Sequence, residues 1–328
     1  MSQLVTIIGG SGFVGRYIAR RMAQAGWRVR VAVRRPNEAL HVKPYGVVGQ
    51  VEPVFCNIRD DASIRAVING ADAVVNCVGI LFEQGANKFD DVQAAGAGRV
   101  ARISAEQGVR TLVHISAIGA DAASDSAYQR SKARGEALVT EHFPNAVILR
   151  PSLVFGTEDQ FFNRFAGMAR FSPVLPVVGA DTRFQPVYVD DVAAAAAKAV
   201  LDGAAPGVYE LGGPEVATFR ALMTRMLGEI RRNRLLLNLP LPVARLQAGM
   251  LDLAQTVTLG LFTNSLLTRD QVRNLARDNV VSDGAKGLAD LGITPTPMEA
   301  ILPSYLWLHR PGGQYKAIHE SAANLRKR

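Results

Sequence analysis

The sequence has few cysteines, and its histidines lack the spacing of metal ligands. Only Cys56 and Cys77 occur in 328 residues, and both lie in apolar, β-branched stretches typical of strands. Neither a disulfide framework nor a cysteine metal site is predicted, and a reducing compartment is expected. Because the five histidines are scattered without H-x-x-x-H spacing, we expect no bound metal.

Internal repeats, low-complexity tracts and a membrane-spanning segment are also lacking. The stretch from Leu246 to Leu267 is interrupted by Asp252, Asn264 and two glycines, which argues against a spanning helix. A strand-like run begins within a few residues of Met1, so we expect no signal or transit peptide and a protein that starts in the cytoplasm. The net charge of +8 favours anionic partners without choosing among them.

Alternating strand-like and helix-like runs make up most of the chain. Strands are predicted at about residues 4–8, 28–33, 52–58, 73–78, 111–118, 146–155, 185–189 and 208–211. Helical patterns separate most of the first six, which predicts an α/β fold with a doubly wound parallel sheet. Asp190 and Asp191 precede an alanine-rich helix, and we interpret them as helix caps rather than as a catalytic pair.

The first strand runs into a glycine-rich turn and then a helix. Glycines at 9, 12 and 15 would allow a tight turn, a close approach to a pyrophosphate, and close packing of the helix on the strand. The helix N-terminus attracts the anion, and the strand–turn–helix context favours this interpretation over a merely tight turn. The predicted pyrophosphate-binding residues are Gly9, Gly10, Ser11, Gly12, Phe13, Val14 and Gly15. The pattern therefore predicts a dinucleotide-binding domain of the Rossmann type.

Arginines follow the second strand, where an acidic residue would bind the ribose of NAD. The strand closes with Arg34 and Arg35, and the nearest acid is Glu38. A guanidinium can fork onto a 2′-phosphate and stack on adenine, so these arginines favour NADPH as the cofactor. The alternative is that they are solvated surface residues of a basic protein.

Two more strand ends are expected to line the cofactor. Asn57 and Ile58 would lie near the adenine, and Cys77, Val78 and Gly79 beside the rest of the molecule, because ligands of parallel sheets bind at the carboxyl ends of strands. These residues could equally be generic strand ends, so both interpretations stay open.

A second group of polar residues follows the fifth strand. Ser116 ends that strand, while Tyr128 and Lys132 lie one turn apart on a helix and share a face. A lysine ammonium near the phenol would favour phenolate and make Tyr128 a general acid or base. The spacing Y-x-x-x-K occurs often by chance, but its place in a Rossmann domain favours cofactor binding. Pro151, after the sixth strand, is expected to position the chain over the nicotinamide without catalysing.

Together these segments resemble the extended or atypical short-chain dehydrogenase/reductase superfamily, and more narrowly the NADPH-binding accessory subunit family of respiratory complex I. The broader resemblance lies in residues 9–15, 128–132, 150–151 and 186–192, and the narrower one in residues 149–156, 158–163, 185–189 and 267–272. It implies a tightly held NADPH and a structural or assembly role without turnover. The resemblance also implies that the partners are other complex I subunits, with peripheral contact to the membrane and no nucleic acid. The implied location is the cytoplasmic face of a bacterial inner membrane.

Two departures from active superfamily members accompany the resemblance. Gln93 stands where many of them place the asparagine of a proton relay, and the segment between Ser116 and Tyr128 is short. Ser116, Tyr128 and Lys132 are thus at most vestigial catalytic residues. The alternatives are a free-standing NADP-dependent reductase, epimerase or dehydratase, and a soluble NADPH-sensing regulator.

The division expected for the chain is an NADP-binding Rossmann domain at residues 1–155, with a returning segment near 185–212, and a smaller, mainly helical docking domain at 156–328. The region after Pro214 is basic, with Arg220, Arg225, Arg231, Arg232 and Arg234 close together. An apolar stripe at helical spacing consists of Leu246, Met250, Leu253 and Val257. The stripe fits a docking surface and core packing equally well.

Overall fold

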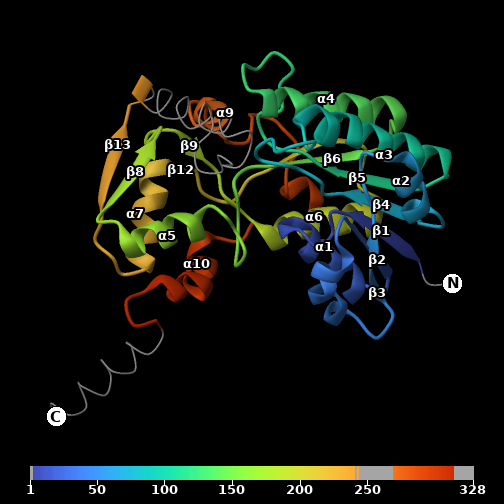
Figure 1. Ribbon diagram of the computed structural model, residues 1–328, viewed down its shortest axis with the longest axis horizontal. Helices are drawn as coiled ribbons and strands as arrows, with labels where there is room; N and C mark the ends of the chain where they lie inside the picture. Colours follow the sequence, from blue (N-terminus) through green and yellow to red (C-terminus); the bar gives the residue numbers. More distant parts are fainter. Residues whose placement is uncertain (1–2, 241, 244–268, 314–328) are drawn as a thin grey trace, which may run out of the picture.

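A seven-stranded parallel sheet forms the right-hand part of the computed structural model, which describes residues 3–240, 242–243 and 269–313 (Figure 1). Its strand order is β11-β6-β5-β4-β1-β2-β3. The strands are β1 (Leu4–Ile8), β2 (Arg28–Val33), β3 (Val51–Phe55), β4 (Ala73–Asn76), β5 (Thr111–Ile115), β6 (Val147–Pro151) and β11 (Gly207–Leu211). The order reverses direction between β1 and β4, and the predicted doubly wound sheet is confirmed.

Helices cover both faces of this sheet. One face carries α1 (Phe13–Gln24), the 3-10 helix η1 (Pro36–Tyr45) and α6 (Val189–Lys198), which share a core with Ile7. The other carries α2 (Asp61–Ile68), α3 (Ala95–Glu106) and α4 (Ala127–His142), and the core beneath α2 to α4 includes Ile8. Neighbouring strand residues point to opposite faces, so nearly every central-strand residue is buried, as the continuous apolar runs indicate.

Several strands end earlier than their sequence pattern predicts. β3, β4 and β5 stop at residues 55, 76 and 115, and the residues beyond them turn away into loops at the carboxyl edge of the sheet. The run expected at 146–155 divides into β6 and the short β7 (Val154–Phe155). β7 pairs with β10 (Val187–Tyr188), outside the main sheet. Hydrophobicity continues past these strand ends because the loops are also partly buried.

A smaller region lies on the left in Figure 1 and has its own core of aromatic and aliphatic side chains. It contains α5 (Phe162–Phe171), β8 (Val174–Val178), β9 (Arg183–Phe184), β12 (Ala217–Thr218), α7 (Phe219–Glu229), β13 (Leu235–Leu239), α9 (Arg269–Asn274) and α10 (Met298–Leu306). The rings of Phe161, Phe165 and Phe219 contact one another with centroids 5.4–5.5 Å apart. Within the described part of the chain, no helix is long and apolar enough to cross a membrane.

The segment after β7 connects this region to the sheet. The Glu158 carboxylate lies 3.4 Å from Arg16 and accepts a hydrogen bond of 2.9 Å from the Tyr17 hydroxyl, both on α1. The next residue, Asp159, is buried and accepts a hydrogen bond from the hydroxyl of Tyr305 on α10. Two adjacent carboxylates thus hold α1 and α10 to the same short segment.

Asp190 and Asp191 are not helix caps, and that prediction is wrong. Helix α6 begins at Val189, and the N-cap position falls on Tyr188, so both aspartates lie within the first turn. Asp190 forms a bidentate ion pair with Arg21 of α1, at 2.7 and 2.8 Å. Asp191 accepts hydrogen bonds from the backbone and hydroxyl of Thr296. Both carboxylates therefore join elements distant in sequence.

Candidate functional site

The glycine-rich turn joins β1 to α1 at the carboxyl edge of the sheet. Gly9 has a φ of +80°, which favours glycine, and its N–H donates to the carbonyl of Ala32 at the end of β2 over 2.8 Å. A Cβ on Gly15 would lie 2.5 Å from the carbonyl oxygen of Gly9. The turn and the first turn of α1 thus pack backbone against backbone.

The N-terminus of α1 is left without a side-chain cap. Gly12 occupies the N-cap position, and there is no acidic residue in the first turn. In contrast, Asp60 caps α2 and Ser126 caps α4 with side-chain oxygens. Uncapped N–H groups and the helix dipole make an anion site, so the start of α1 fits a pyrophosphate.

The two arginines after β2 differ in their partners. Both side chains are exposed, but Arg35 lies 3.0 Å from Glu38, whereas Arg34 has no carboxylate partner among the described residues. The hydrogen bond from Gly9 to Ala32 brings the end of β2 beside the glycine turn. Arg34 is therefore the better placed of the two for a phosphate near this edge.

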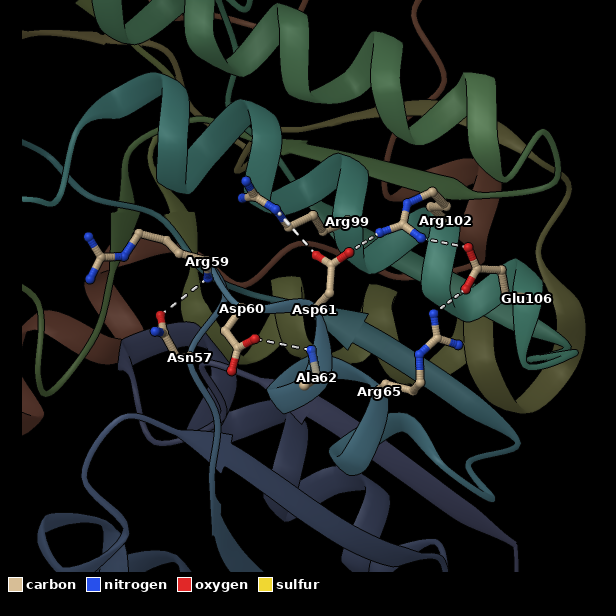
Figure 2. Close-up of polar contacts among 9 residues, drawn as sticks. All are labelled: Asn57, Arg59, Asp60, Asp61, Ala62, Arg65, Arg99, Arg102 and Glu106. Carbon is tan, nitrogen blue, oxygen red and sulfur yellow. Dashed lines mark hydrogen bonds and ion pairs between the residues drawn. The ribbon is translucent and has the colours of Figure 1, made fainter.

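At the end of β3 the two predicted residues separate. Asn57 is partly buried, and its side-chain oxygen accepts a hydrogen bond of 3.2 Å from the backbone of Arg59 (Figure 2). Ile58 is instead a core residue, and its side chain would lie 3.1 Å from a Cβ on Gly96 of α3. Figure 2 also shows the ion-pair network that ties α2 to α3, made of Asp61, Arg65, Arg99, Arg102 and Glu106.

The turn after β4 is shaped by Asn76, a residue that sequence reasoning missed. Its buried side chain accepts a hydrogen bond of 3.1 Å from the N–H of Val78 and lies 3.3 Å from a ring nitrogen of His114. Cys77, between Asn76 and Val78 in the chain, is partly buried, and burial raises the pKa of its thiol to about 12. Cys77 is therefore a neutral lining residue at neutral pH.

Gly79, Lys132 and Gln93 converge where β4, α4 and the segment before α3 meet. A Cβ on Gly79 would lie 3.4 Å from the Lys132 ammonium nitrogen and 3.7 Å from the side-chain oxygen of Gln93. The Gln93 oxygen is buried and has no hydrogen-bond partner in the part of the chain that is described. An ammonium donor and an orphaned acceptor facing a glycine fit the hydroxyls of a ribose.

Lys132 is buried, and its ammonium group donates to the carbonyl of Ile115 over 3.2 Å. Burial lowers the pKa of Lys132 to about 8, while the nearby carboxylate of Glu136 opposes that shift. Because much of this lysine is still protonated at neutral pH, it can bind a hydroxyl as a donor.

Tyr128 does not show the predicted tendency to form phenolate. Burial and the negative charge of Asp270 raise its pKa to about 12, the opposite of the expected shift. The ring of Tyr128 packs edge to face against that of Phe89, with the ring centroids 5.9 Å apart. The ammonium group of Lys132 donates to the Ile115 carbonyl instead of lying on the phenol. The expectation of an activated tyrosine was therefore wrong, because the spacing of the pair did not reveal where the ammonium would point.

Ser116 belongs to a buried ionic network. Its hydroxyl donates to the carboxylate of Glu136, which Arg150 holds through hydrogen bonds of 2.9 and 2.6 Å. Arg150 also lies 3.4 Å from Glu210 on β11. This network joins α4 to two strands. No local sequence pattern indicates it, because its members are distributed over about a hundred residues.

Pro151 ends β6, and its carbonyl accepts a hydrogen bond of 3.0 Å from the N–H of Ile118. The next residue, Ser152, donates its hydroxyl to Asn279 over 2.7 Å. Asn279 and Asp270 come from the segment that starts at α9, and neither was predicted as a site residue. The signal for Asp270 was the family resemblance of residues 267–272, and no sequence signal pointed to Asn279.

Sequence comparisons agree with this geometry. Residues 5–212 match the model of the NAD dependent epimerase/dehydratase family. The chain is 35% identical to NADH dehydrogenase [ubiquinone] 1 alpha subcomplex subunit 9 of Arabidopsis thaliana, over 94% of this chain and 79% of that protein. The protein of the same name in Dictyostelium discoideum is 30% identical over 96% of this chain and 87% of its own length.

A bacterial enzyme and solved structures give more distant matches. A ceramide reductase of Caulobacter vibrioides is 32% identical over 58% of this chain and 59% of its own. An NADPH-dependent quinone oxidoreductase from Escherichia coli has a TM-score of 0.69 at 17% identity, covering 92% of this chain and 98% of that one. A UDP-glucose 4-epimerase of Thermus thermophilus, solved with NAD, has a TM-score of 0.58 at 19% identity, covering 73% and 86%. The fold is thus of the NAD(P)-binding type.

The uncapped helix, the glycine turn and these matches lead to one assignment. The chain belongs to the NAD dependent epimerase/dehydratase family, and within it to the group of complex I alpha subcomplex subunit 9.

Proposed function

We propose that this chain is an NADPH-binding accessory subunit of respiratory complex I, with a structural or assembly role and no turnover of its own. The observation that carries the proposal is the similarity to subunits of NADH dehydrogenase over more than 90% of the chain. It includes the smaller region as well as the sheet, so it extends beyond the part shared with the epimerase/dehydratase model.

NADPH is the cofactor that this site is proposed to hold. The start of α1 would bind the pyrophosphate, and Arg34 the 2′-phosphate, because its guanidinium is exposed and no carboxylate follows β2 directly. Gly79, Gln93 and Lys132 would receive the ribose next to the nicotinamide. When bound, NADPH supplies a hydride donor.

The absence of turnover is supported by how the polar groups are engaged. The Ser116 hydroxyl donates to Glu136, and the pKa of Tyr128 is raised to about 12, so the phenol holds its proton firmly. A general acid works best with a pKa near the working pH, and this tyrosine is far from that condition. Bound NADPH would then act as a structural ligand that stabilises the folded state.

The smaller region is proposed to dock on the membrane-embedded part of the complex, on the cytoplasmic face of the inner membrane in a bacterium. We propose that the chain divides into a cofactor-binding domain at residues 1–155, with a returning segment near 185–212, and a docking domain at residues 156–328.

The apolar stripe at residues 246, 250, 253 and 257 lies outside the described residues. Of the basic residues, Arg225 is engaged by Glu215 and Glu299, at 2.7 and 3.0 Å.

Two arginines of the same basic stretch, Arg232 and Arg234, lie near Arg170 and are better placed for docking. Arg170, Phe171, Arg232, Arg234 and Leu235, called the arginine surface below, lie near one another at the end of α5 and around the start of β13. Burial and the two neighbouring guanidinium groups lower the pKa of Arg232. Phe171 is 87% exposed and Leu235 65%. Positive charge beside exposed apolar groups fits an anionic headgroup surface.

Native extraction tests the proposal directly. Membranes are solubilised with a mild detergent, complexes are separated under native conditions, and bands are identified by mass spectrometry. The chain should migrate with complex I, and deleting its gene should reduce the amount or stability of the assembled complex. If complex I assembles with unchanged stability without this chain, the subunit proposal is wrong.

The second candidate is a free-standing NADP-dependent reductase. The observation in its favour is the 32% identity to a ceramide reductase over 58% of the chain, together with the retained Tyr128 and Lys132. Oxidation of NADPH by a panel of long-chain ketones, aldehydes and nucleotide sugars distinguishes the two candidates. Turnover that is lost in Tyr128→Phe would establish the reductase instead.

A further inference from the structure

A carboxylate from α9 lies on the N-terminus of α4, the helix that carries Tyr128 and Lys132. Asp270 accepts hydrogen bonds from the Ser126 hydroxyl at 2.8 Å, the Ala127 N–H at 2.8 Å and the Tyr128 N–H at 3.2 Å. A negative charge on a helix N-terminus is favourable, and hydrogen bonds to an ionised group are the stronger ones. Asp270 therefore fixes the first turn of α4 from more than 140 residues away in sequence.

The chain that follows Asp270 is held at further points. The Arg273 guanidinium donates to the carbonyl of Asp125 over 3.1 Å, in the loop before α4. Asn279 accepts the Ser152 hydroxyl at 2.7 Å, directly after β6. Residues 270–279, called the latch below, thus run from the start of α4 to the carboxyl end of β6.

The path of the latch crosses one half of the dinucleotide site. In a doubly wound sheet that reverses between β1 and β4, one half of the ligand lies over β1 to β3 and the other over β4 to β6. The uncapped start of α1 marks the pyrophosphate between the halves, so the nicotinamide half lies on the side of Tyr128. The latch contacts the start of α4, which carries Tyr128, and Ser152, which follows β6.

We propose that the latch closes the nicotinamide side of the site, with Asp270 as the positioning residue that fixes it to α4. This proposal rests on the proposed function, since it takes NADPH as the occupant. A closed latch keeps the bound dinucleotide from leaving and keeps outside substrates from Tyr128. A fold that other members of the family use for catalysis would in this way serve to retain the bound dinucleotide.

The charge of Asp270 has a second effect on the same tyrosine. Together with burial, it raises the pKa of Tyr128. The other charged side chains of α4 are Arg130, Lys132, Arg134, Glu136 and Glu141. Arg130 donates to the Ser124 carbonyl beside the same turn, and the Lys132 ammonium donates to Ile115. Phe89, which packs on the phenol ring, is apolar. Removing the Asp270 charge should therefore release the helix turn and lower the pKa of Tyr128 together.

The test is the rate at which NADPH leaves the full-length protein. The protein is loaded with NADPH, an excess of NADP⁺ is added, and the loss of bound nicotinamide fluorescence is followed. Asp270→Asn should increase the dissociation rate by about tenfold, since a charge-assisted cap is lost. The matched control is Asp72→Asn, which removes a carboxylate bonded to Leu4 and Arg110 at the opposite end of the sheet, and it should match wild type.

A second measurement covers the case in which Asp270→Asn folds poorly. In the wild-type protein, saturating NADPH should slow amide hydrogen exchange in residues 270–279 as well as in the glycine turn. Unchanged exchange in residues 270–279, or an unchanged dissociation rate in a folded Asp270→Asn, would overturn the latch and leave NADPH binding intact. A wild-type protein that binds no NADPH would overturn the cofactor assignment and the latch together.

Discussion

The Ser116 hydroxyl donates its hydrogen bond to the carboxylate of Glu136, and Arg150 holds that carboxylate from β6. The hydrogen of Ser116 is therefore committed to a buried ionic network at the base of the site. The neighbouring Tyr128 has a pKa raised to about 12 by burial and the Asp270 charge, far from the value that suits a general acid at neutral pH.

We predict that Tyr128 contributes to binding and not to turnover. Tyr128→Phe should weaken NADPH binding about threefold to tenfold, the effect of losing one hydrogen bond to a ribose hydroxyl. Steady-state oxidation of NADPH should be undetectable in both proteins. Calorimetry gives the affinities, and absorbance of the reduced nicotinamide gives the rates. Rapid oxidation that depends on Tyr128 would contradict this prediction.

Arg34 should determine the preference for NADPH over NADH. Arg34→Asp should reduce the affinity for NADPH by about a hundredfold, because a charge-assisted bond to the 2′-phosphate is replaced by repulsion, and should change NADH binding little. Arg35→Ala is the matched control. Its guanidinium is already engaged by Glu38, so it should have a smaller effect. Equal wild-type affinity for the two cofactors, measured by calorimetry, would refute the assignment.

Gly15→Ala should disrupt the pyrophosphate site through sterics alone. The new methyl would lie 2.5 Å from the Gly9 oxygen and 2.7 Å from the Gly10 Cα, so the turn must shift. We expect a loss of about 1–3 kcal/mol in the free energy of unfolding, and weaker NADPH binding. Gly167→Ala on α5 is the control. Apart from its own stretch of helix backbone, nothing in the described part of the chain lies within 4 Å of its added Cβ, so it should stabilise by roughly 0.5–1 kcal/mol. Urea unfolding measures both variants.

Lys132 should make the stability of the NADPH-free protein depend on pH. Its folded pKa is about 8 against an ordinary value of 10.5, so between these values the unfolded chain binds a proton that the folded chain has lost. The contribution of this residue to the free energy of unfolding should therefore rise with pH, by on the order of 2–3 kcal/mol. Urea unfolding at pH 7.5, 9 and 10 should show this rise in wild type relative to Lys132→Met. Parallel pH dependence in the two proteins would contradict it.

The sheet was predictable from the sequence because its strands are buried on both faces and read as continuous apolar runs separated by helical patterns. The glycine turn was predictable because its chemistry is confined to residues 9–15. The boundaries of β3, β4 and β5 were not, since apolar character continues into the partly buried loops after them.

The rest of the site depends on contacts between distant segments. The approach of Asp270 to α4, and that of Arg150 to Glu136 and Glu210, follow from tertiary packing and leave no local pattern. The same reason explains the wrong prediction for Tyr128. Helical spacing places Lys132 on the same face, but the flexible lysine side chain finds a backbone carbonyl instead.

The arginine surface should hold the protein to membranes by two forces that respond differently to salt. Each cation near anionic lipid contributes about 1 kcal/mol and is screened by salt. Phe171, which is 87% exposed, adds an apolar contribution on insertion that salt does not weaken. High salt should therefore release the protein from native membranes only partly, and Phe171→Ser should make that release nearly complete.

Charge reversal tests the electrostatic part of the same prediction. Arg170→Glu should lower the membrane-bound fraction at low salt, while Arg28→Glu, an exposed arginine at the start of β2, should leave it unchanged. Sedimentation of native membranes with immunodetection measures the bound fraction. Replacing Leu246, Met250, Leu253 and Val257 by serine tests the later apolar stripe while keeping α10 in the core of the smaller region. If these substitutions abolish attachment while Arg170→Glu and Phe171→Ser have no effect, docking resides in the later residues and the arginine surface is not the contact.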